Sequence, residues 1–88
     1  MRCTFDPTKD QANQSKHGVS LALAENFEWD SAVVWPDDRR DYSEPRQCAL
    51  GYIADRLVNL VFVDRAGKRR IISLRKANKR EERIYAET

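Results

Sequence analysis

A continuous run of mostly apolar residues, 57–63 (LVNLVFV), limits what this chain can fold into more than any other feature. Odd and even positions of the run are both apolar, so an extended segment would carry apolar side chains on both faces. A strand of that kind belongs at the centre of a sheet. Residues 46–53 (RQCALGYI) form a second strand pattern, and the three residues between the two runs predict a hairpin.

Charge is divided unevenly along the chain. Residues 65–83 hold nine basic residues against two acidic ones, a net charge of +7, whereas residues 1–64 hold seven basic and eleven acidic residues, a net charge of −4. A basic concentration of this kind attracts polyanions, of which phosphate is the commonest in a cell. A solvated basic strand and helix without a ligand is an equally simple interpretation.

Residues 69–76 of the basic stretch alternate as a strand does. The side chains expected on the core face are Arg70, Ile72, Leu74 and Lys76. Those expected on a more polar face are Arg69, Ile71, Ser73 and Arg75. Asn78 then predicts the cap of a short C-terminal helix, in which Glu81 and Tyr85 share one face.

The N-terminal part predicts a strand over residues 1–5 and two helices. Asp6 and Pro7 are typical of a helix start and Gly18 of its end, so a helix is expected over residues 7–17. That helix is polar almost all round, which places it over the edge of the fold or against a partner or ligand. His17, the single histidine, has an unperturbed pKa of about 6.5 and is suited to proton transfer, or it stabilises the helix end through the dipole.

Ser20 predicts the cap of the second helix, which should cover the sheet. Its expected apolar side consists of Leu21, Ala22, Leu23, Ala24, Phe27 and Trp29. Residues 31–35 follow as a strand that Pro36 should end. Residues 37–45 (DDRRDYSEP) form a loop with more charged and aromatic side chains than a connector needs, although ion pairs within the loop would also explain them.

These patterns together predict one α+β domain over residues 1–88. It should contain an antiparallel sheet of four to five strands, with two N-terminal helices on one face and a short C-terminal helix. No stretch approaches the roughly 18 apolar residues of a membrane span, and the N-terminus lacks the apolar core of a signal peptide. Cys3 and Cys48 lack metal-ligand spacing and are expected as reduced, buried thiols of a cytoplasmic protein.

Four ordered motifs from Phe5 to Tyr85 resemble the BrnT family of ribonuclease toxins from bacterial type II toxin–antitoxin pairs. They are FDPxK (residues 5–9), NxxKHGVS (13–20), DRRxYxExR (38–46), and RIISxRKA with ExxxY (70–85). One position departs from the family pattern, because Ser43 stands where glycine is frequent before Glu44. That change is expected to stiffen the loop without removing a chemical group.

The resemblance implies a fold related to the RelE toxins and an RNA-cleaving activity that stops translation. It also implies neutralisation by a BrnA antitoxin, which carries a ribbon-helix-helix DNA-binding portion. The toxin is therefore expected in a hetero-oligomer with this antitoxin, and operator DNA would be reached only through the antitoxin.

RNA cleavage without a metal requires a base, an acid and cations beside the phosphate. The sequence has no cluster of acids, histidines or cysteines suited to a metal, which favours a metal-free endoribonuclease without a cofactor. Candidate catalytic residues are Arg75, Lys76, Glu44, His17 and Tyr85; the last three are the proton-transfer candidates, in no fixed order. Candidate RNA-binding residues are Arg39, Arg40, Arg46, Tyr42, Ser73, Lys79 and Arg80. Trp35 and Tyr52, like Tyr42, are candidates for stacking on a base, or else pack in the fold.

Two other interpretations of the basic stretch remain open. The chain could be a non-catalytic nucleic-acid-binding module that holds phosphates alone, or a decayed toxin that only binds its antitoxin. RNA binding that weakens with salt is expected of both an enzyme and a binding module, but only an enzyme leaves new RNA ends.

Overall fold

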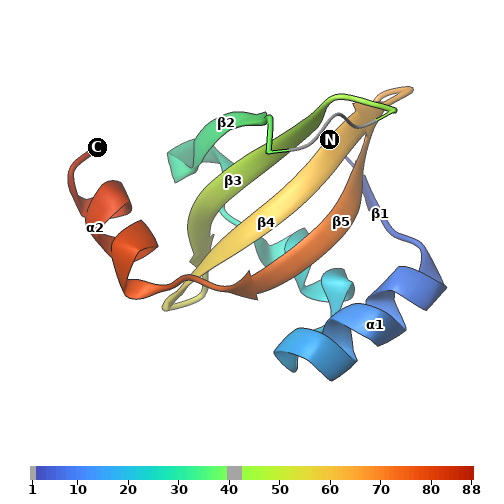
Figure 1. Cartoon of the computed structure of the whole chain (residues 1–88), viewed down its shortest axis with the longest axis horizontal. Helices are drawn as coiled ribbons and strands as arrows, with labels where there is room; N and C mark the ends of the chain where they lie inside the picture. Colours follow the sequence, from blue (N-terminus) through green and yellow to red (C-terminus); the bar gives the residue numbers. More distant parts are fainter. Residues whose placement is uncertain (1, 40–42) are drawn as a thin grey trace.

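The computed structural model describes residues 2–39 and 43–88 and contains a five-stranded mixed sheet (Figure 1). The strands are β1 (Arg2–Thr4), β2 (Val33–Asp37), β3 (Arg46–Ile53), β4 (Arg56–Arg65) and β5 (Lys68–Lys76). Their order in the sheet is β1-β5-β4-β3-β2. Strands β2 to β5 form an antiparallel meander, as expected of the predicted antiparallel sheet, with β4 at the centre, and β1 pairs in parallel with β5. The α+β class is confirmed, whereas the sheet is mixed rather than purely antiparallel.

The described helices are α1 (Pro7–His17), the 3-10 helices η1 (Leu21–Asn26) and η2 (Trp29–Ser31), and α2 (Lys79–Ala86). Asp6 caps α1 by accepting from the Thr8 amide, and Gly18 ends it in the left-handed region at φ 75°. Asn78 and Glu81 form a reciprocal capping box at the start of α2. Both predicted caps are therefore confirmed. None of the helices described has the length and apolar character needed to cross a membrane.

The second predicted helix is the 3-10 helix η1, and its apolar side is narrower than expected. Three residues per turn place Leu21, Ala24 and Phe27 in one row, and all three are buried. Leu23, expected on the apolar side, is 40% exposed. The cap at Ser20 is as predicted, since its side chain accepts from the backbone of the first turn.

Strand β2 begins and ends later than residues 31–35. It runs through Pro36 to Asp37, and Ser31 belongs to η2 instead. Proline does not end this strand because β2 lies at the edge of the sheet, where a residue without an N–H group is tolerated.

Strand β5 contains a β-bulge at Ile72. Val61 of β4 pairs with Ser73 and its neighbour Phe62 pairs with Ile71, so that Ile72 has no partner in the register. An extra residue of this kind reverses the faces on which the side chains before it lie.

The bulge makes the simple alternation wrong for the first half of β5. Ile71, expected on the polar face, is fully buried in the core beside Leu74, whereas Ile72 is only half-buried. Beyond the bulge, Ser73 and Arg75 share the polar face, as expected.

The two faces of the sheet carry separate clusters, because consecutive residues of a strand point to opposite sides. The main core, under η1, consists of Leu21, Ala24, Phe27, Ala49, Val58, Leu60, Phe62, Ile71 and Leu74. The second cluster consists of Leu50, Leu57 and Ala77, with Trp35, Tyr52 and Tyr85 packed against it. Since Tyr85 belongs to α2, the C-terminal helix packs on the face opposite η1; Figure 1 shows α2 well separated from α1.

Helix α1 is attached to the edge of β5 by polar contacts. Asn13 is 6% exposed; its Nδ2 donates to the carbonyls of Leu74 (2.8 Å) and Val19 (3.0 Å), and its Oδ1 accepts from the Leu74 amide (3.2 Å). Strand β1 pairs only with the first three residues of β5, so the Asn13 amide replaces a neighbouring strand at Leu74. Asp10 attaches α1 to η1 as well, by accepting from the Leu21 amide (2.7 Å). The polar helix thus lies over the edge of the fold.

Both cysteines are free thiols. Cys48 is buried and Cys3 is half-buried. Burial raises the pKa of each thiol, so both side chains are protonated at neutral pH.

The substitution Asn13→Ala should lower the free energy of unfolding by about 2 to 4 kcal/mol, because it leaves the buried N–H and C=O groups of Leu74 without partners. Urea unfolding measures this difference. Ser15→Ala, at an exposed position of the same helix, is the control and should change stability by no more than about 0.5 kcal/mol. Equal stabilities for the two variants would contradict the proposed attachment.

Candidate active site

A cleft of about 720 Å³ opens on the face of the sheet opposite η1. Its floor comes from three adjacent strands, with Cys48 on β3, Asn59 and Val61 on β4, and Ser73 on β5. The walls are formed by Lys16 and His17 at the end of α1, residues 35–39 of β2 and its end, Arg75, and Asn78, Arg80, Glu81 and Ile84 around α2. The N-terminal helix α1 and the C-terminal helix α2 thus contribute to one cleft.

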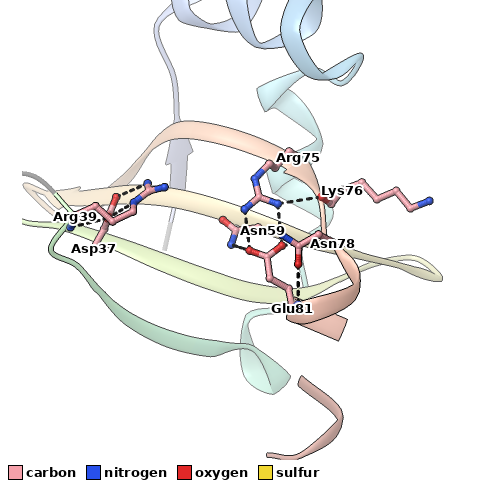
Figure 2. Close-up of polar contacts among 7 residues, drawn as sticks. All are labelled: Asp37, Arg39, Asn59, Arg75, Lys76, Asn78 and Glu81. Carbon is pink, nitrogen blue, oxygen red and sulfur yellow. Dashed lines mark hydrogen bonds and ion pairs between the residues drawn. The ribbon is translucent and has the colours of Figure 1, made fainter. Parts of the chain in front are cut away.

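Arg75 is held in the cleft by the carboxylate of Glu81 (Figure 2). Its Nη1 donates to Oε1 and its Nη2 donates to Oε2, both at 2.8 Å. Two further donors complete the carboxylate: Asn59 Nδ2 on Oε2 at 2.7 Å and the Asn78 amide on Oε1 at 3.0 Å. Each oxygen of Glu81 therefore accepts two hydrogen bonds, and a bidentate pair of this kind restricts the guanidinium to one orientation.

Glu81 is ionised although it is only 9% exposed. Burial alone would raise the pKa of its carboxyl, but the hydrogen bonds from Arg75, the Asn78 backbone and Asn59 outweigh that effect and lower the pKa. The sequence placed Glu81 on a helix face without assigning it to the site. Its position three residues after the Asn78 cap indicates a capping box, but it does not indicate a contact with Arg75.

A second arginine–carboxylate pair lies in the lining of the same cleft (Figure 2). Arg39 Nε and Nη2 donate to the two oxygens of Asp37 at 2.8 and 2.9 Å. The Asp37 side chain is 1% exposed, whereas that of Arg39 is 69% exposed. The buried carboxylate therefore anchors an arginine that faces solvent.

His17 contributes an imidazole to the cleft lining from the last position of α1. Its pKa is lowered from the usual 6.5 by desolvation, and then by the positive charges of Lys16 and Arg75. The imidazole is consequently neutral at pH 7 and able to accept a proton.

Among the candidate residues that the structure describes, five line this cleft: His17, Arg39, Ser73, Arg75 and Arg80. Among the stacking candidates, Trp35 also lines it. Within the described part of the chain, Arg80 makes no salt bridge, so its charge is not neutralised by a neighbouring carboxylate.

Other candidates lie elsewhere. Glu44 forms an ion pair with Arg65 at the far end of β4. Tyr85 donates its hydroxyl to the Ser31 carbonyl at 2.9 Å and packs edge-to-face against Tyr52. The Lys76 side chain is exposed and points away from the Arg75–Glu81 pair (Figure 2).

Two further candidates among the described residues are also separate from the cleft lining. Arg46 is half-buried opposite Asp37 in the β2–β3 pairing, and Lys79 is exposed at the start of α2. Arg40 and Tyr42 lie outside the described residues. Among residues 2–39 and 43–88, no three side chains of His, Cys, Asp or Glu gather where they could hold a metal ion.

A cleft with anchored arginines and a neutral imidazole, on an α+β sheet, is suited to binding and cleaving a phosphodiester. Residues 5–81 match the family model described as the ribonuclease toxin BrnT of a type II toxin–antitoxin system. The chain therefore belongs to the BrnT family of ribonuclease toxins. RNA is accordingly the substrate of its class and an antitoxin its partner. None of the curated proteins compared with the chain matches it.

The imidazole of His17 should titrate with a midpoint below pH 6.5, because desolvation and two nearby cations favour the neutral form. Proton NMR of the single histidine gives this midpoint directly. Arg75→Gln should raise it by removing one of the cations, whereas Arg83→Gln, which alters a cation without influence on His17, should not. A midpoint above 6.5 that is insensitive to Arg75 would show that the two side chains are not neighbours.

Proposed function

We propose that the chain is a metal-independent endoribonuclease and that the cleft between α1, β5 and α2 is its active site. In this mechanism His17 takes the proton of a ribose 2′-hydroxyl, and the 2′-oxygen attacks phosphorus as the bond to the 5′-oxygen breaks. The leaving oxygen takes a proton from water. The products are a 2′,3′-cyclic phosphate and a 5′-hydroxyl end.

The observation that carries this proposal is the presence of a neutral His17 and a fixed Arg75 in one cleft. A base must be unprotonated to act, and a lowered pKa keeps it so. An arginine held in one orientation stabilises charge that develops on the phosphoryl oxygens without reorganising during the reaction. Arg39 and Arg80 line the same cleft and are suited to the neighbouring phosphates of the strand.

The lining of the cleft favours single-stranded RNA. Trp35 offers an aromatic side chain in the lining, and Ser73 and Asn59 offer polar groups on the floor. Unpaired bases stack on aromatic rings and present their Watson–Crick edges to such groups, whereas in a duplex these edges are already paired.

We also infer a BrnA-type antitoxin with a ribbon-helix-helix portion as the partner, in a cytoplasmic hetero-oligomer that reaches operator DNA only through the antitoxin. Family membership supports this, as it supports a RelE-like fold. The exposed arginines of the cleft favour an acidic antitoxin segment that covers them and excludes RNA.

Arg75→Gln and His17→Gln should each reduce RNA cleavage by about 10²- to 10³-fold, since each removes a group assigned to the reacting phosphodiester. Induction of the chain alone in a bacterial host, followed by mapping of RNA ends, measures growth arrest and cleavage together. Lys76→Gln removes a neighbouring charge outside the cleft and should leave both unchanged. Cleavage by the purified chain should also persist in excess EDTA.

His17→Gln keeps the Arg75–Glu81 pair and so separates loss of chemistry from loss of structure. Full cleavage by both cleft variants would contradict the site. RNA binding that falls steeply with salt, without new ends, would instead identify a non-catalytic binding module. Loss of cleavage in EDTA would contradict the metal-free mechanism.

A further inference from the structure

We propose that Glu81 and Asn59 are positioning residues that present one edge of the Arg75 guanidinium to the scissile phosphate. This inference rests on the proposed function of the cleft. It assigns the role of Arg75 to the direction of its N–H groups rather than to its charge.

The hydrogen bonds of Arg75 leave one pair of donors available. A guanidinium has five N–H groups. Glu81 accepts one from Nη1 and one from Nη2, and the Lys76 carbonyl accepts from Nη1 at 3.3 Å. Within the described residues, the Nε–H group and the second Nη2 hydrogen have no acceptor. These two donors lie on the same edge of the guanidinium, in the parallel arrangement that binds two oxygens of a phosphate.

Asn59 holds the carboxylate that sets this orientation. It lies directly opposite Arg75 in the pairing of β4 with β5, and its side chain donates to Glu81 from the floor of the cleft. It is 6% exposed and is the one polar residue in the apolar run 57–63. A polar side chain at the centre of the sheet costs stability unless it is bonded, so its contact with Glu81 explains its presence there.

The charges of the pair support an orienting role. The carboxylate of Glu81 offsets the positive charge of Arg75, so a site that relied on charge alone would be weakened by this neighbour. A bidentate carboxylate instead fixes the plane of the guanidinium, and a reacting group in the correct plane gains rate through orientation. Loss of the Glu81 charge should therefore strengthen RNA binding, because Arg75 is no longer offset. It should also slow catalysis, because the guanidinium is no longer held in one plane.

Glu81→Gln separates these effects. Glutamine keeps the size of the side chain and the capping box, but one carboxylate oxygen becomes an amide that faces the donors of Arg75 and Asn59. The net charge of the protein rises by one, so KM for RNA should stay the same or fall. kcat should fall by about 10- to 100-fold because Arg75 is no longer held in one plane.

Glu82→Gln is the matched control, since it makes the same chemical change at the next, exposed position of α2. It should leave kcat within about twofold of the unaltered chain. In an Arg75→Lys background, Glu81→Gln should have little further effect, because lysine has no planar edge to orient. A kcat for Glu81→Gln equal to that of Glu82→Gln, or a full additional loss in the lysine background, would overturn the inference.

A side-chain NMR measurement tests the positioning apart from cleavage. In the unaltered chain, the Nη groups of Arg75 should give separate signals because their rotation is restricted, and these signals should merge in Glu81→Gln. Arg75→Lys assigns them by their disappearance. If the unaltered chain cleaves no RNA, the proposed function fails, but the NMR signals still show whether Glu81 holds the Arg75 guanidinium in place. Merged Arg75 signals in the unaltered chain would overturn it.

Discussion

The bidentate pair between Arg75 and Glu81 joins the central part of the sheet, the C-terminal helix and the cleft into one unit. Glu81 comes from α2, Arg75 from β5 and Asn59 from β4, and all three meet at one carboxylate. Because a buried carboxylate is stable only when its oxygens are satisfied, α2 must pack where these donors converge. The position of the helix and the orientation of the arginine therefore depend on the same four hydrogen bonds.

The attachment of α1 at Leu74 brings the second half of the site to the first. Asn13 binds the backbone of Leu74, the residue next to Arg75, and His17 lies one turn further along the same helix. The polar character of α1 therefore has a structural reason. Its buried Asn13 makes the backbone hydrogen bonds that a neighbouring strand would make at the sheet edge. Its last turn places the neutral imidazole of His17 in the cleft.

Local signals predicted the parts of the fold that local forces decide. The predictions were correct for the caps at Asp6, Gly18 and Asn78, for the hairpin and for the central strand, since each depends on residues that are close in sequence. The bulge at Ile72 could not be predicted because it depends on the pairing of β5 with β4, and it moved Ile71 into the core. His17 and Arg75 were candidates individually, but their shared cleft, and the part played by Glu81, required contacts between residues far apart in the sequence.

The most direct test of the active site is an NMR titration with a short single-stranded RNA that carries 2′-O-methyl groups and so cannot be cleaved. RNA bound in the cleft should shift the signals of His17, Asn59, Ser73 and Arg75, on the face opposite η1. Shifts confined to the Arg65–Lys68 turn, at the other end of the basic stretch, would place RNA away from the cleft and contradict the site.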